Sequence, residues 1–147
     1  IISIEIYIKH ELSHILLYQN MSYPAAYKYP QWLMEGIAVY SVNQMGTSWY
    51  PGKSETYNMI RNRNYFPPYL FKTSKEDSIK LNVKYPAAFK YSEFACIVDF
   101  LIQKYGKEKF NNYMKGLLTH NNHDELFKEL YGISFENFLK EFVDAIN

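Results

Sequence analysis

The chain has 147 residues, of which 48% are apolar, and its formal net charge is +1 at pH 7. This length suffices for one domain with its own core, and the near balance of charges gives no field that would attract nucleic acid or anionic lipid. No segment is long and apolar enough to suggest a membrane span. The single cysteine, Cys96, cannot form an internal disulfide, and its apolar neighbours predict a core residue. We therefore expect one domain over residues 1–147 that does not bind nucleic acid.

The first 19 residues permit two interpretations. Apolar and polar residues alternate from Ile2 to Ile8, as in a strand, whereas a longer stripe at helical spacing comprises Ile4, Ile8, Leu12, Ile15 and Leu16. Neither Gly nor Pro separates the alternating part from the rest, so a strand would have to become a helix without a turn. We therefore predict a helix over residues 1–19.

The rest of the chain reads as further helices and one long irregular segment. Residues 20–29 are predicted to form a loop, and a second helix is expected from about Pro30 until Gly46 closes it. Residues 47–86 are irregular, with a short helical pattern near 54–61, and could be either a cleft wall or a connector. Four helices are predicted after this segment, at 87–105, 107–118, 122–130 and 134–146. The fold class is therefore mainly α.

The sequence from His10 to His14 carries the clearest chemical pattern of the chain, His-Glu-Leu-Ser-His. Residues four apart lie on one face of a helix, so His10 and His14 can bind one metal ion, with Glu11 beside them as a candidate general base. Alone, the pattern also fits a surface helix that carries two histidines.

A third ligand would decide between these two interpretations. Glu35 lies 21 positions after His14 on the second predicted helix and has apolar neighbours, where an unpaired carboxylate would be costly. Zinc commonly takes two histidines and one carboxylate and keeps a fourth position open. We therefore predict Zn²⁺ bound by His10, His14 and Glu35. A di-iron bundle, which also uses Glu-x-x-His pairs, would need a second pair besides Glu11 and His14, and the sequence has none.

These motifs resemble the gluzincin zinc metallopeptidases, especially the peptidase MA-like domains and more distantly the catalytic domain of aminopeptidase N. The resemblance rests on His10-Glu11-x-x-His14 and on Glu35-Gly36 in a helix led by tryptophan. The segment Tyr91-Ser92-Glu93-Phe94-Ala95 is similar to the one in which the family's catalytic tyrosine heads an apolar helix. By this match Tyr91 would be the transition-state donor, with Tyr85 as a competing candidate.

The resemblance implies a thermolysin-like C-terminal helical subdomain that hydrolyses peptides or proteins. Glu11 would accept a proton from a zinc-activated water as this water attacks a peptide carbonyl. Tyr91 would then hydrogen-bond the developing oxyanion.

Two departures from the family pattern leave an alternative open. Thermolysin-like members support a zinc histidine with an Asp four residues after the third ligand, but this position is Val39 here, so the support must come from elsewhere. The family's β-sheet, whose edge strand holds the substrate, would lie upstream, and we expect it to be largely absent from this chain and the chain to be part of a longer protein. The alternative is a zinc-containing binding or scaffolding module without catalysis. Similar small domains lead us to expect a bacterial cell-surface or secreted location.

Some other residues could carry function but have simpler interpretations. His120 and His123 flank two asparagines, and we expect a solvated turn there rather than a second metal site. A group of aromatic residues could either line a substrate groove or pack beneath the long irregular segment: Trp49, Tyr50, Tyr65, Phe66 and Tyr69.

Overall fold

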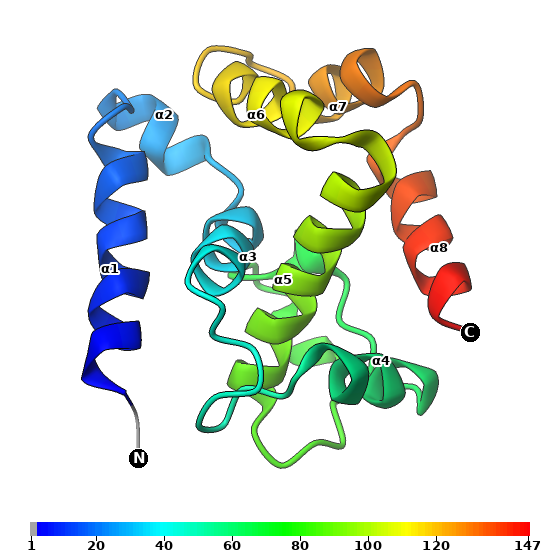
Figure 1. Ribbon diagram of the computed structural model, residues 1–147. Helices are drawn as coiled ribbons and strands as arrows, with labels where there is room; N and C mark the ends of the chain where they lie inside the picture. The colour runs from blue at the N-terminus through cyan, green and yellow to red at the C-terminus, as the bar shows by residue number, and fades with distance from the viewer. Residues whose placement is uncertain (1–2) are drawn as a thin grey trace.

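A computed structural model describes residues 3–147, and these residues form helices joined by loops, without any strand. The long helix α5 (Pro86–Tyr105) runs through the middle of the molecule, and α3 (Gln31–Ser41) packs against it (Figure 1). Helix α1 (Ile4–Tyr18) lies on the outer side of α3. The remaining elements are α2 (Tyr23–Lys28), α4 (Lys53–Arg61), the short 3₁₀ turns η1 (Pro68–Leu70) and η2 (Glu76–Ser78), α6 (Lys107–Gly116), α7 (His123–Tyr131) and α8 (Phe135–Ile146). The predicted mainly α fold class is confirmed.

Helices α3 and α5 make the closest helix contact in the core. The Cα of Gly36 faces the backbone of Phe94, and a Cβ added at Gly36 would lie only 2.8 Å from the Phe94 carbonyl oxygen. Leu33, Ala38 and Val39 of α3 are fully buried on either side of this contact. The absence of a side chain at Gly36 therefore sets the separation of the two helices and, with it, the position of the adjacent Glu35.

The core is rich in aromatic rings contributed by the C-terminal helices. Helices α6, α7 and α8 pack around one end of α5 (Figure 1), and their buried rings include Phe127, Phe138 and Phe142. Trp32, at the start of α3, stacks on Phe135 of α8 with ring centroids 5.4 Å apart. Phe138 and Phe142 of α8 also contact the ring of Phe100 on α5.

The long segment between α4 and α5 is attached to α5 by both apolar and polar contacts. Phe66 is buried, and its backbone N–H donates to a carboxyl oxygen of Glu93 over 3.0 Å. Burial raises the pKa of Glu93 well above its usual value. The ring of Phe71 lies 5.1 Å from that of Phe94. Phe66 is therefore a packing residue, whereas Tyr69 is largely exposed.

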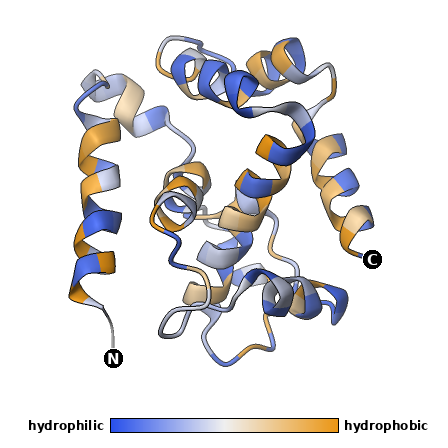
Figure 2. Cartoon of the chain, viewed as in Figure 1, coloured by the Kyte–Doolittle hydropathy of each residue, from blue (hydrophilic) through white to orange (hydrophobic). Residues whose placement is uncertain are grey.

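The predicted N-terminal helix is confirmed for the described part of its range, and residues 1 and 2 lie outside the described residues. Its only buried residue is His10. The apolar residues that identified the helix are exposed to solvent instead of core-facing, and they comprise Ile4, Ile8, Leu12, Ile15 and Leu16. Figure 2 shows apolar residues in orange along α1. The contacts of α1 with α3 include those of His10 and His14 with Glu35.

Two boundaries were predicted wrongly. Residues 20–29 are not simply a loop, because Ser22 caps a short helix, α2, by accepting the N–H of Ala25, and a proline is tolerated in its first turn. Helix α3 ends at Ser41, five residues before the glycine that was expected to close it. Gly46 has a φ of 80° and instead forms a turn whose N–H donates to the carbonyl of Tyr50. The helices predicted after residue 86 are confirmed to within one or two residues.

Candidate active site

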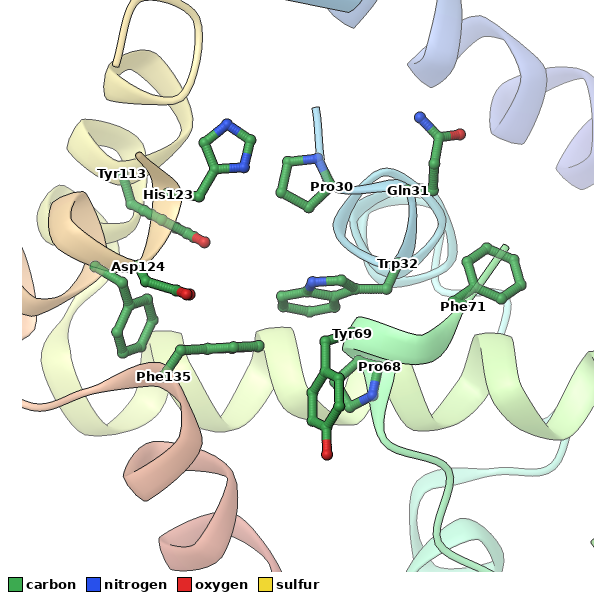
Figure 3. Close-up of a pocket in the computed structure, with 11 residues that line it drawn as sticks. Pro30, Gln31, Trp32, Pro68, Tyr69, Phe71, Tyr113, His123, Asp124 and Phe135 are labelled. Carbon is green, nitrogen blue, oxygen red and sulfur yellow. The ribbon is translucent and has the colours of Figure 1, made fainter. Parts of the chain in front are cut away.

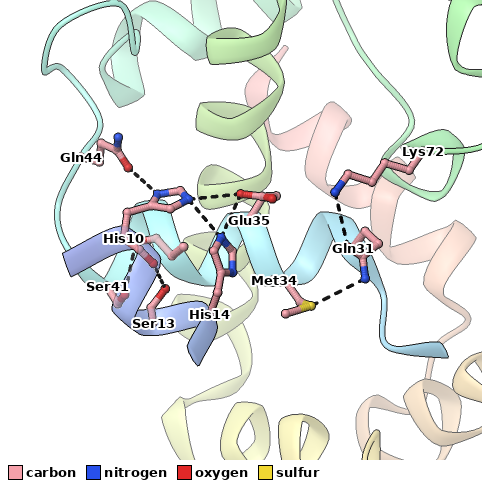
Figure 4. Close-up of polar contacts among 10 residues, drawn as sticks. His10, Ser13, His14, Gln31, Met34, Glu35, Ser41, Gln44 and Lys72 are labelled. Atoms are coloured by element: carbon pink, nitrogen blue, oxygen red, sulfur yellow. Dashed lines mark hydrogen bonds and ion pairs between the residues drawn. The ribbon is translucent and has the colours of Figure 1, made fainter. Parts of the chain in front are cut away.

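Two helices bring the three predicted metal ligands together. One turn of α1 separates His10 from His14, so both imidazoles face α3, which presents Glu35 to them (Figure 4). The Nε2 atoms of His10 and His14 lie 3.1 Å apart. The Oε2 atom of Glu35 lies 3.2 Å from the Nε2 atom of His10 and 3.3 Å from the Nε2 atom of His14. Three potential ligand atoms thus converge on one point.

The spacing of these atoms fits a small tetrahedral metal ion. Bonds of about 2.0 Å to nitrogen and oxygen place the ligand atoms of a tetrahedral site about 3.3 Å apart. The spacings of 3.1 to 3.3 Å in the cluster agree with this value. Residues 3–147 contain no other group of three or more His, Cys, Asp or Glu side chains arranged in this way.

The electrostatics of the cluster keep the Glu35 carboxylate charged. Burial raises the pKa of Glu35, but hydrogen bonds from His10 and His14 outweigh this effect and bring the pKa down to about 2. Burial lowers the pKa of His10, yet its hydrogen bonds with Glu35 and Gln44 leave the pKa above the usual value. The Nδ1 atom of His14 is buried without a hydrogen-bond partner among the described residues. Glu35 is therefore in the ionised form that metal binding requires.

Gln44 hydrogen-bonds the ring nitrogen of His10 that faces away from Glu35, and the sequence analysis did not identify this residue. The Nδ1–H of His10 donates to the side-chain oxygen of Gln44 over 2.7 Å, and Gln44 is buried. In the neutral ring this bond places the proton on Nδ1 and leaves the lone pair of Nε2 free for a metal. Val39, at the position where thermolysin-like members have the supporting Asp, is fully buried in the core. The support comes instead from the turn after α3, in which the N–H of Gln44 donates to the carbonyl of Val39.

Glu11 and Tyr91 lie near the cluster without being part of it. Glu11 is exposed on α1, and its charge contributes to the raised pKa values of His10 and Tyr91. Burial is the main cause that raises the pKa of Tyr91 to about 12, and the charge of Glu35 adds to it. Tyr91 is half-buried on α5, with its ring 5.8 Å from that of Phe71. It is therefore protonated at neutral pH and can donate a hydrogen bond.

A second tyrosine, Tyr50, lies in the same region. Burial raises the pKa of Tyr50, the charge of Glu35 adds to this, and a hydrogen bond with Gln44 opposes it. The ring of Tyr50 lies 6.4 Å from that of Tyr91. Tyr85, the competing candidate from the sequence, directly precedes α5, and its ring lies 6.2 Å from Trp49. The charge of Glu35 thus contributes to the raised pKa values of Tyr50 and Tyr91. The ring of Tyr85 instead contacts the exposed Trp49.

The remaining sequence candidates lie elsewhere. The Nδ1 atom of His120 accepts the N–H of Asn122 within the turn before α7, and His123 lines a separate cavity. Neither histidine belongs to the cluster of His10, His14 and Glu35. Cys96 is fully buried, as predicted. None of the helices in residues 3–147 has the length and apolar character that crossing a membrane requires.

Two crossing helices that bring a pair of histidines and a carboxylate together define a helical domain with a potential metal site. The sequence model of the Peptidase MA superfamily matches residues 5–146. The chain therefore belongs to this superfamily, which confirms the predicted resemblance and makes the domain peptidase-like. Searches of curated proteins and of solved structures found no match.

Proposed function

We propose that this domain is a zinc-dependent peptidase of the gluzincin type, in which His10, His14 and Glu35 hold the metal. The observation that supports this most directly is the convergence of their ligand atoms within 4.8 Å of one another. The third ligand comes from a separate helix, and three protein ligands would leave a fourth position of a bound zinc ion for water or substrate. The expected substrates are peptides or proteins.

The residues around the cluster can be assigned roles in hydrolysis of a peptide bond. A zinc ion held there would act as a Lewis acid that makes a water molecule acidic near neutral pH. Glu11, exposed beside His10, accepts the proton of the attacking water and returns it to the leaving amine. Tyr91 keeps its proton at neutral pH and donates a hydrogen bond to the carbonyl oxygen as negative charge develops on it. Gln44 holds the His10 ring in its orientation.

The alternative function is a zinc-containing binding or scaffolding module without catalysis. One reason for it was the missing Asp at Val39, and the bond between His10 and Gln44 removes that reason. The alternative predicts zinc binding without turnover of any peptide. The peptidase proposal predicts both zinc binding and turnover of a peptide.

The metal site is tested by comparing two histidine substitutions. Loss of a residue that only hydrogen-bonds a metal ligand costs roughly 10–100-fold in metal affinity. We expect His14→Ala to reduce zinc affinity by more than this, because it removes a ligand itself. His120→Ala is the matched control, since His120 lies in the turn before α7 and outside the cluster. Calorimetric titration with zinc, supported by elemental analysis, measures both. Equal zinc affinity in the two variants would contradict the site.

The role of Tyr91 is tested by removing only its hydroxyl group. We expect Tyr91→Phe to lower kcat by about a hundredfold, because an oxyanion donor acts mainly in the transition state. Zinc content should stay unchanged, since Tyr91 is not a ligand. Tyr85→Phe serves as the control, because its ring contact is with Trp49. Cleavage of quenched fluorescent peptides gives both rates, and a larger loss in Tyr85→Phe would reverse the assignment.

A further inference from the structure

A second concave site lies at the start of α3, between η1, α6, α7 and α8 (Figure 3). Its volume is about 250 Å³, which suits one side chain better than a drug-sized molecule. Six aromatic side chains line it, namely Trp32, Tyr69, Phe71, Tyr113, Phe127 and Phe135. None of the proposed catalytic or metal-binding residues belongs to it.

Trp32 gives the cavity a flat aromatic surface. One face of its indole is stacked on Phe135, with an angle of 20° between the rings, which fixes the plane of the indole. Figure 3 shows the indole extending into the middle of the cavity, toward the side on which Asp124 and Tyr113 lie. Trp32 is only 5% exposed, so a planar cation would reach just the part of the indole that borders the cavity, through cation–π contact and stacking.

The polar groups around this surface are hydrogen-bond acceptors. Tyr113 is only 3% exposed, makes no hydrogen bond among residues 3–147, and points its hydroxyl into the cavity (Figure 3). The hydroxyl lies at the surface of the cavity, where a ligand can bond to it. The Asp124 carboxylate points the same way and has no ion-pair partner among the described residues. Burial lowers the pKa of His123, so its ring is neutral at neutral pH and offers a nitrogen acceptor.

We propose that this cavity binds the side chain of an arginine from a polypeptide. A guanidinium group is flat enough to stack on Trp32 and carries five N–H donors, which match the acceptors of Asp124 and Tyr113. A lysine ammonium is a compact point charge and uses the indole face less fully. The aliphatic part of the arginine side chain packs against Pro30, which also lines the cavity.

Two lysines near the cavity oppose a bound cation and limit its affinity. Lys28 lies close enough to His123 to help lower its pKa, and the ammonium of Lys72 lies 3.5 Å from the side-chain oxygen of Gln31. Both lysines and Asp124 are exposed, so solvent and salt screen all three charges. We expect a dissociation constant on the order of 1 mM for an isolated arginine side chain.

The cavity adjoins the metal-ligand cluster along α3. Gln31 lines the cavity and precedes Glu35 by one helical turn, and Phe71 lines it while its ring contacts that of Tyr91. An arginine held here would therefore place neighbouring residues of the same peptide near the cluster. The placement of a peptide near the cluster rests on the proposed peptidase function, whereas the binding of arginine does not.

The binding is tested with the metal-free protein, so that no catalysis is needed. N-acetyl-arginine amide is titrated and compared with N-acetyl-citrulline amide, which has a similar shape but no charge. The two tryptophan indole N–H signals in proton–nitrogen NMR spectra are followed, with Trp49 as an internal control because it lines a different pocket. We expect the arginine compound to shift the Trp32 signal and to bind at least about tenfold more tightly than the citrulline compound.

Two variants identify the groups that bind the cation. Asp124→Asn should weaken binding of the arginine compound about tenfold and leave the citrulline compound unaffected, because it removes only the charge. Asp144→Asn, on α8 outside this cavity, is the matched control. Tyr113→Phe provides a second readout that keeps the aromatic core and should also weaken binding. Equal affinity for the two compounds, or unchanged affinity in both Asp124→Asn and Tyr113→Phe, would overturn the proposal.

The outcome is separable from that of the peptidase proposal. Zinc binding and peptide cleavage are measured on the loaded protein, whereas arginine binding is measured without metal. Failure of the peptidase proposal therefore leaves the test of arginine binding unaffected, and failure of arginine binding leaves the peptidase proposal unaffected. If both hold, peptides with arginine near the cleaved bond should be cut faster than the same peptides with citrulline.

Discussion

Replacing Glu11 by Gln is expected to lower kcat by about a hundredfold or more while zinc remains bound. The amide keeps the size of the side chain but cannot accept the proton that the attacking water loses, and general-base catalysis contributes about 10²–10⁴ in rate. The three proposed ligands are untouched, because Glu11 lies outside the group formed by His10, His14 and Glu35. KM should change little, since Glu11 is assigned to proton transfer and not to peptide binding.

The experiment compares Glu11→Gln with Glu5→Gln on the same helix. Glu5 is exposed and pairs with Lys9 one turn away, so its loss removes the same charge without affecting the cluster. Cleavage of a quenched peptide library gives kcat, and elemental analysis gives the zinc content. Unchanged turnover in Glu11→Gln would remove the general base from the mechanism. Absence of turnover in the wild type, with zinc bound, would favour the non-catalytic module.

The grouping of His10, His14 and Glu35 could be predicted from the sequence, because it depends on local spacing and on the cost of burying an unpaired carboxylate. His10 and His14 are four apart on a helix, and Glu35 is a carboxylate among apolar neighbours that needs a partner. Both signals are local, and the structure brings the three residues together as predicted. Their role as zinc ligands stays a prediction.

Gln44 could not be predicted, because its function depends on a turn and not on a helical pattern. The sequence predicted that α3 would continue to Gly46, which would have placed Gln44 within the helix. The helix ends at Ser41, and the following turn brings the Gln44 amide to the far side of His10. Only the path of the backbone after Ser41 determines this contact.

The exposed stripe on α1 shows the limit of periodicity as evidence. Helical spacing of apolar residues correctly indicated a helix, but it did not reveal which face of that helix would meet the core. Periodicity reports how the side chains are arranged around one helix, whereas burial depends on its partners. The cavity around Trp32 was missed for the same reason, because its residues come from five elements that are distant in sequence.

Replacing Gly36 by Ala is expected to destabilise the fold by about 1–3 kcal/mol, the usual cost of overpacking a core. The new Cβ would lie 2.8 Å from the Phe94 carbonyl oxygen and 3.0 Å from its carbonyl carbon. Both are backbone atoms in the middle of α5, so the helices must separate to relieve the contact. The higher helix propensity of alanine, worth about 1 kcal/mol, offsets only part of this cost.

Gly116→Ala is the matched control for this prediction. Its Cβ would come equally close to a neighbour, 2.9 Å from a methyl group of Leu126, but a side-chain methyl can rotate away. Urea denaturation should therefore show a clearly smaller loss of unfolding free energy for Gly116→Ala. Similar losses in the two variants would mean that the contact of α3 with α5 adapts easily.

The same substitution connects packing with the proposed site. Glu35 is adjacent to Gly36, so a shift of α3 away from α5 also changes the distance between Glu35 and Tyr91, which lies on α5. It moves Glu35 relative to the histidines of α1 as well, and misplacement by about 1 Å can cost a hundredfold in rate. We therefore expect Gly36→Ala to weaken zinc binding and lower kcat even where the protein is still folded, whereas Gly116→Ala should change neither.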